Sequence, residues 1–82
     1  MHEHGVITRL MDIALEEARR REGRLATVRV RLGALVASTP ERFREDFEHV
    51  CAELGARGVQ LEIEPAPDHP AGVELLSIDV EE

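Results

Sequence analysis

The stretch Thr27-Val28-Arg29-Val30-Arg31-Leu32 decides the fold, because apolar and polar side chains alternate along its whole length. A period of two places the apolar side chains on one face of a β-strand and the charged ones on the other. We therefore predict a half-buried strand that ends at Gly33. The apolar face requires a covering layer, and the charged face is expected to meet solvent.

Helical patterns lie on both sides of this strand. From Val6 to about Arg21 an amphipathic helix is predicted, with apolar residues at helical spacing. A second helix is predicted to begin at Ser38-Thr39-Pro40-Glu41. Ser38 and Glu41 have the spacing of a capping box, and a proline is tolerated in the first helical turn. The two apolar stripes consist of Ile7, Leu10, Met11, Ala14 and Ala18 in the first helix and Phe43, Phe47, Val50, Cys51 and Leu54 in the second.

Two further strands are predicted after the second helix. Residues 59–64 alternate as the first strand does, and residues 73–80 carry apolar side chains in phase up to Val80. Adjacent Leu75 and Leu76 break that alternation, which indicates a bulge or a covered edge. The intervening residues 65–72 contain three prolines and are predicted to form an irregular loop.

This order of elements predicts an α+β fold, in which two helices pack on one face of a small three- to four-stranded mixed sheet. Each helix has one apolar stripe and each strand has one apolar face, so a two-layer arrangement buries both. We expect residues 1–82 to form one domain, because a chain of this length has room for one small core.

Composition and charge narrow the classes of function. The net charge is −7, and Phe43 and Phe47 are the only aromatic residues, so a nucleic-acid binder is disfavoured and a protein or cation is the expected partner. There is no signal-peptide pattern and no apolar run long enough to span a bilayer. Cys51 is the only cysteine, so no intramolecular disulfide can form. We expect a cytoplasmic protein, away from membranes, that is a monomer or a weak homodimer.

The sequence contains no pattern of an enzyme active site, and we predict that the protein is not an enzyme. Cys51 lies within an apolar helical stripe, which is typical of a packed side chain. His49 is two positions away and therefore on another helix face, so it cannot readily act as a base for Cys51. His69 lies in the proline-rich loop and is predicted to be solvated.

The densest group of potential metal ligands is Met1-His2-Glu3-His4. The Met1 amine, the His2 amide and the His2 imidazole can close two fused chelate rings on one ion. Such planar, nitrogen-rich ligand sets suit Ni(II) or Cu(II). Protons leave these groups on binding, so affinity should fall in acid. On sequence statistics alone, however, an untied polar terminus without a metal is the favoured interpretation.

Several stretches together resemble the HypA family of nickel metallochaperones for hydrogenase and urease maturation. They cover most of the chain, and their order and spacing carry the resemblance: Met1-His2-Glu3, residues 28–35, Thr39-Pro40-Glu41, residues 59–64 and residues 74–80. The resemblance implies that Met1, His2 and Glu3 bind nickel. It also implies that the protein delivers Ni(II), with a HypB-type GTPase or a hydrogenase or urease subunit as its partner.

The chain departs from the family pattern in one large feature. Family members normally carry a zinc-binding insert with two Cys-x-x-Cys pairs between the last two strands, and residues 65–72 take that place here. A lone cysteine cannot hold a tetrahedral zinc, so we expect no structural zinc. His4 stands where an apolar residue is usual, either as an added ligand or as a solvent-facing residue. The alternative function is a metal-independent interaction or regulatory module that kept the fold and lost part of the metallochaperone role.

Overall fold

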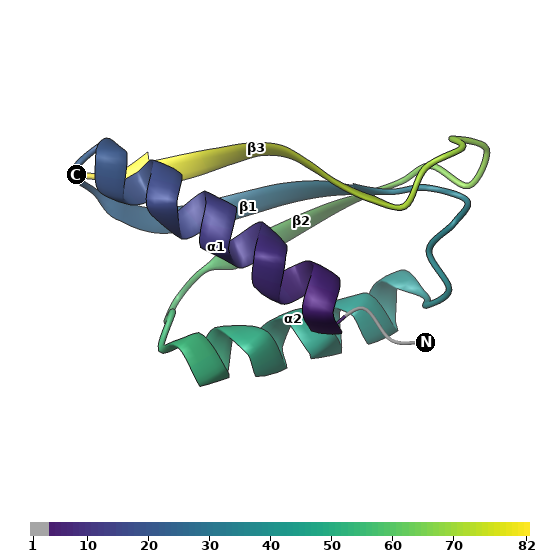
Figure 1. Cartoon of the computed structure of the whole chain (residues 1–82), viewed down its shortest axis with the longest axis horizontal. Helices are drawn as coiled ribbons and strands as arrows, with labels where there is room; N and C mark the ends of the chain where they lie inside the picture. Colours follow the sequence, from purple (N-terminus) through teal and green to yellow (C-terminus); the bar gives the residue numbers. More distant parts are fainter. Residues whose placement is uncertain (1–3) are drawn as a thin grey trace.

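The computed structural model describes residues 4–82 and contains two helices and a three-stranded sheet (Figure 1). Its elements follow in the order α1 (His4–Arg20), β1 (Arg24–Leu32), α2 (Pro40–Leu54), β2 (Gln60–Pro65) and β3 (Val73–Glu81). The predicted α+β fold is confirmed.

The alternating stretch that opens the sequence argument is the central strand of a mixed sheet, whose strand order is β2-β1-β3. β1 runs parallel to β2, and Val30 lies opposite Ile63. β1 runs antiparallel to β3, where Val30 lies opposite Leu75. The parallel pair is joined through α2, because parallel neighbours need a crossover connection.

The bulge predicted at the paired leucines is confirmed. Arg29 lies opposite Ser77 while the next residue, Val30, lies opposite Leu75, so Leu76 is an extra residue in β3. The extra residue explains why the alternation of β3 fails at this point. Its side chain is 40% exposed.

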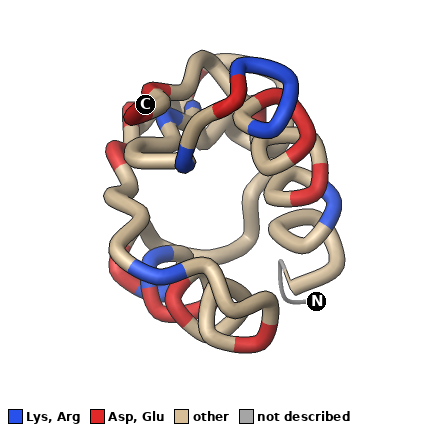
Figure 2. The backbone as a smooth tube through the Cα atoms, turned by 90° about the vertical axis from the view of Figure 1, so that its left-hand side faces the viewer, with Lys and Arg blue, Asp and Glu red and all other residues tan. Residues whose placement is uncertain are grey.

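The core lies between one face of the sheet and the two helices. In Figure 2 the sheet and the helices together surround it. Both predicted helical stripes are buried, except that Leu54 at the end of α2 is 40% exposed. The largest fully buried side chains are Phe43, Phe47, Ile7, Met11, Val28, Val30 and Val50. This aliphatic set with two phenylalanines provides the hydrophobic stabilisation of the fold.

The other face of the sheet carries a ladder of ion pairs centred on β1. The Arg29 guanidinium donates to Glu62 on β2 at 2.8 Å and to Asp79 on β3 at 2.7 Å. Arg31 donates to Glu64 on β2 at 2.8 Å. These side chains are exposed or half-buried, so water and salt screen the pairs and each one adds little to the stability of the fold.

The start of α2 differs from the predicted capping box. The N-cap is Thr39, whose hydroxyl accepts a hydrogen bond from the Arg42 backbone N–H at 3.1 Å. A proline restricts the residue before it to extended backbone, and Thr39 has φ −75° and ψ 162°. Pro40 therefore moves the cap one residue beyond Ser38, and the prediction of Ser38 as the cap was wrong.

The loop after β2 is irregular, as predicted, but it is tied to the segment that follows β1. The backbone N–H groups of Gly33 and Ala34 donate to the carbonyls of Gly72 and His69, at 3.0 and 2.8 Å. A Cβ at Gly33 would collide with the carbonyl oxygen of Ala71, so the close approach of these two segments requires glycine there. Both segments lie at the right-hand end of Figure 1.

Candidate metal centre at the N-terminus

The predicted nickel ligands Met1, His2 and Glu3 lie outside the described residues. The description begins at His4, which is the first residue of α1. The geometry that can be analysed is therefore that of the helix end next to the predicted ligands.

The first turns of α1 are held firmly against the core. Ile7 and Met11 are fully buried, and Leu10 is buried with them. In the same turns, the Thr8 hydroxyl donates a hydrogen bond to the His4 carbonyl oxygen at 2.9 Å. Packing and this side-chain bond both fix the position of the first helical turn, so the residue that follows the predicted ligands has a defined place.

His4 also contacts the second helix. Its Nε2 atom lies 3.2 Å from Oε1 of Glu53, and the two side chains are 45% and 63% exposed. The contact links the first turn of α1 to the last turn of α2. The imidazole is thus neither simply solvent-facing nor surrounded by further ligands, since it has one acidic neighbour on another helix.

The remaining histidines do not assemble a second metal site. His49 is exposed on α2. His69, predicted to be a solvated loop residue, is 37% exposed and places Nε2 at 2.9 Å from Oε1 of Glu74. Nowhere in residues 4–82 do three His, Cys, Asp or Glu side chains come together as a possible metal site. The His69–Glu74 pair could not be predicted from local pattern, because the fold of the loop brings the two residues together.

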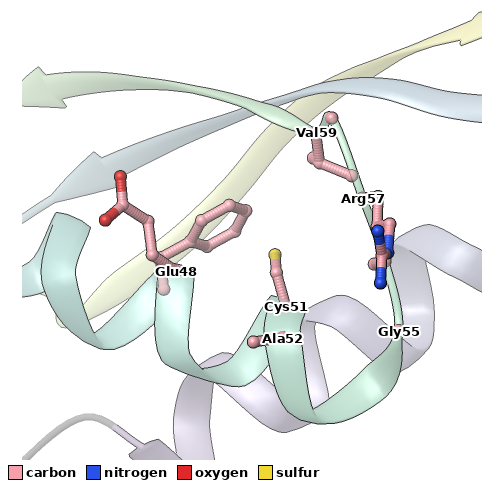
Figure 3. Close-up of a pocket in the computed structure, with 9 residues that line it drawn as sticks. Glu48, Cys51, Ala52, Gly55, Arg57 and Val59 are labelled. Atoms are coloured by element: carbon pink, nitrogen blue, oxygen red, sulfur yellow. The ribbon is translucent and has the colours of Figure 1, made fainter.

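Cys51 is a packed side chain, as predicted. It is buried in α2, where it lines a cleft that Glu48 also borders (Figure 3). Burial raises the pKa of the Cys51 thiol, and the negative charge of Glu48 adds to this rise. A thiol with a raised pKa stays protonated at neutral pH, which makes it a poor nucleophile and a poor metal ligand.

Among the described residues, no helix has the length and apolar character needed to cross a membrane.

Comparisons with known proteins give a consistent result. The family model for HypA, described as hydrogenase/urease nickel incorporation and metallochaperone, matches residues 1–70. The fold is similar to the solution structure of the Ni metallochaperone HypA from Helicobacter pylori, with 19% identity, a TM-score of 0.76, and coverage of 98% of this chain and 97% of that one. A second solution structure of a HypA protein has 20% identity, a TM-score of 0.75, and coverage of 99% and 97%. The comparison with curated proteins found no match.

The two kinds of comparison support different statements. At about 20% identity the structural likeness establishes the fold. The family model covers most of the sequence, from Met1 through the end of β2 and into the loop. On that match, the chain belongs to the HypA family of nickel metallochaperones, which act in hydrogenase and urease maturation and are not enzymes.

Proposed function

We propose that this protein binds Ni(II) through Met1, His2 and Glu3 and delivers it during the maturation of a [NiFe]-hydrogenase or a urease. The observation that carries the proposal is the HypA family match, which begins at Met1 and so includes the Met-His-Glu start. In this assignment nickel is the cargo of the protein. A HypB-type GTPase or the enzyme subunit itself is the partner that exchanges it.

The ligand chemistry follows from the residues. Met1 supplies its α-amine, His2 supplies its amide and imidazole nitrogens, and Glu3 supplies a backbone nitrogen or its carboxylate. The first three donors close fused chelate rings, and a planar nitrogen-rich set suits Ni(II). Binding releases protons, so nickel affinity should fall as the pH drops through the pKa range of amine and imidazole.

The predicted ligands directly precede α1 in the sequence, and this position supports a modest affinity for Ni(II). Transfer of the ion to a partner requires such an affinity. α1 begins at His4 and has no acidic residue in its first turn. The N-terminal end of a helix carries partial positive charge, which disfavours a nearby cation. The ligand set must therefore bind nickel against this positive potential. The carboxylate of Glu53 on α2, which contacts His4, offsets part of that potential. A site of this kind releases its ion more readily than a closed cage does.

We also propose that residues 65–72 replace the zinc module of the family and that the protein folds without structural zinc. The chain has one cysteine, Cys51, which is buried in α2 on another part of the fold. The backbone bonds between this loop and the segment after β1 supply a local tie that needs no metal. Treatment with a chelator should leave the unfolding transition unchanged, and a lowered transition would contradict a zinc-free fold.

The decisive experiment is a calorimetric titration of Ni(II) into protein that begins with a native Met1 and into protein with one additional N-terminal residue. The extension keeps every side chain but converts the Met1 amine into a peptide amide. We expect binding by the native form, loss of binding on extension, and equal loss in His2→Ala. Circular dichroism of all three proteins checks that the fold is unchanged.

The other outcomes are equally informative. Equal affinity in the native and extended forms would place nickel away from the terminal amine and contradict the proposed site. Absence of nickel binding in both forms would favour the alternative, a metal-independent interaction module with a HypA fold. Competition with Cu(II) is not a test, because copper binds most nitrogen sites more tightly than nickel.

A further inference from the structure

The outer edge of β2 has backbone groups that the fold leaves without strand partners. β2 is an edge strand, paired only with β1. In a parallel ladder alternate residues turn their N–H and C=O groups to the same side. The Ala66 N–H donates to Leu32, so even-numbered residues face β1. Leu61 and Ile63 therefore direct their backbone groups outward, away from the sheet.

Only part of this edge is blocked within the described chain. Arg44 of α2 donates a hydrogen bond from Nη1 to the Leu61 carbonyl oxygen at 3.0 Å, and this confirms the outward direction of that carbonyl. Pro65, next on the outward side, has no N–H. Among residues 4–82, no loop, helix or side-chain group forms a hydrogen bond with the Ile63 N–H or C=O, both of which point away from β1. Edge strands with such open groups are templates for an added strand.

A groove runs beside this edge, between β2 and α2. One hollow of about 400 Å³ is lined by Ile63 and Pro65 on the strand side and by Glu41, Arg44, Glu45 and Glu48 on the helix side. It adjoins the cleft of about 430 Å³ in Figure 3, which shares Glu48 and ends at Val59. The two hollows together form a groove from Val59, just before β2, to Pro65 at its end. This groove offers apolar strand side chains and a helix rim that is mainly acidic.

The charge around the groove selects its occupant. Three carboxylates of α2 and one guanidinium, that of Arg44, line one side. On the other side Glu62 and Glu64, each already paired with an arginine of β1, project from the open face of β2. A second copy of the chain is disfavoured, because pairing β2 with β2 would set Glu62 and Glu64 against the same carboxylates of the partner. An acidic edge of this kind is complementary to a basic extended segment.

The fold itself contains the pattern that such a segment needs. On the inner side of β2, Arg29 and Arg31 of β1 pair with Glu62 and Glu64, while Val30 lies opposite Ile63. A strand with the same alternation of arginine and branched aliphatic residues would meet the same carboxylates from the outer side. We propose that the β2 edge is a docking site for an extended basic segment of a partner protein, which adds to the sheet as a fourth strand.

This inference does not depend on nickel, so its test uses the whole chain without metal. The probe is the acetylated and amidated peptide Thr-Val-Arg-Val-Arg-Leu, a copy of residues 27–32. Backbone amide shifts and hydrogen exchange are followed by NMR as the peptide is added. We expect exchange at the Leu61 and Ile63 amides to slow, because they gain partners. Exchange at Glu62 and Glu64 should stay as it was, because those amides already bond to β1.

Two peptide controls separate strand addition from simple charge attraction. The first replaces both arginines with glutamate, and it should not bind. The second keeps every side chain but methylates alternate backbone nitrogens, so that it retains its charge and loses its ladder bonds. Equal binding by the methylated peptide would overturn the assignment. Faster exchange at Glu62 and Glu64 would also overturn it, since that result means the peptide has displaced β1.

Matched protein variants test the acidic rim. The triple variant Glu41→Gln, Glu45→Gln, Glu48→Gln should weaken binding by about threefold or more, since each exposed pair contributes a factor of about 1.5 to 5. The control variant Asp12→Asn, Glu22→Gln, Asp68→Asn changes the net charge equally at exposed positions outside the groove and should bind as the parent does. If both variants bound the peptide equally weakly, the net charge of the protein alone would explain the loss, and this result would contradict a site at β2.

Arg44 provides a final check with the opposite sign. Its guanidinium occupies the Leu61 carbonyl and adds positive charge to the groove. Arg44→Gln should therefore tighten binding of the arginine peptide. Weaker binding in this variant, with the amide spectrum of the free protein otherwise preserved, would contradict the proposed mode of docking.

Discussion

The guanidinium of Arg29 donates hydrogen bonds to both carboxylate oxygens of Asp79, at 3.0 and 2.7 Å, across the antiparallel pair β1–β3. The same guanidinium reaches Glu62 on β2, so one side chain bridges all three strands. Its hydrogen bonds to Asp79 hold the pKa of that carboxyl below its ordinary value, against a smaller opposing effect of desolvation. The bridge therefore makes part of the stability of the sheet dependent on pH.

Replacing Asp79 with asparagine should reduce stability at neutral pH and remove part of the loss in acid. Because the folded-state pKa of Asp79 is lowered, its contribution is complete above the ordinary aspartate pKa and disappears as the pH falls through the lowered value. Urea unfolding midpoints of parent and variant should thus differ at pH 7 and converge below about pH 4. A gap that widens in acid would contradict this role, and Asp12→Asn serves as the exposed control.

His4→Gln should leave nickel binding largely intact, in contrast to His2→Ala. The His4 imidazole belongs to the first turn of α1 and lies beside Glu53, so it is engaged by the protein. We expect a change in nickel affinity well below the roughly tenfold that loss of even an outer-shell partner usually costs. Calorimetric titration of both variants checks this. A loss as large as that of His2→Ala would make His4 a ligand.

Gly33→Ala should destabilise the protein by about 1 to 3 kcal/mol, the usual cost of an overpacked site. Its Cβ would meet the backbone oxygens of Ala71 and His69, which are held by the bonds between the loop and the β1 end. Gly72→Ala is the matched control, because a Cβ there has no heavy atom within 4 Å. Chemical unfolding of the two variants gives the comparison. Equal stability would show that the loop yields readily.

Thr39→Ala should cost about 1 kcal/mol of stability through loss of the α2 cap. Ser38→Ala should be nearly neutral, because the Ser38 hydroxyl oxygen is buried with no hydrogen-bond partner in the described chain. The pair distinguishes the observed cap from the capping box expected from spacing alone. Thermal or urea unfolding measures both, and a larger effect at Ser38 would restore the capping box.

Much of the local structure was predictable because it depends on neighbours in sequence. The period of two in residues 27–32 predicts a half-buried strand, and that strand is the centre of the sheet. Helical stripes predicted both helices to within about two residues. The paired leucines at 75 and 76 indicated the bulge that the register shows. The cap of α2 was missed by one residue, because the effect of Pro40 on Thr39 outweighed the capping-box spacing.

The candidate site was predictable in a different sense. The Met-His-Glu start and the order of the family elements led to the HypA family, which the family match then established. The assignment of nickel to Met1, His2 and Glu3 remains a prediction, since those residues lie outside the described part of the chain. The contact between His4 and Glu53 was not predictable, because it joins helices whose relative position depends on the shared core.

By itself the sequence determined which segments form helices and strands, which face of each is apolar, and the family to which the chain belongs. Side-chain periodicity and proline restrictions act over a few residues, so they can be read along the chain. The tertiary structure decided the strand order, the bridge from Arg29 to both neighbouring strands, the pairing of His69 with Glu74, and the open edge of β2. These depend on residues tens of positions apart, which meet only because both helices bury their stripes against the same face of the sheet.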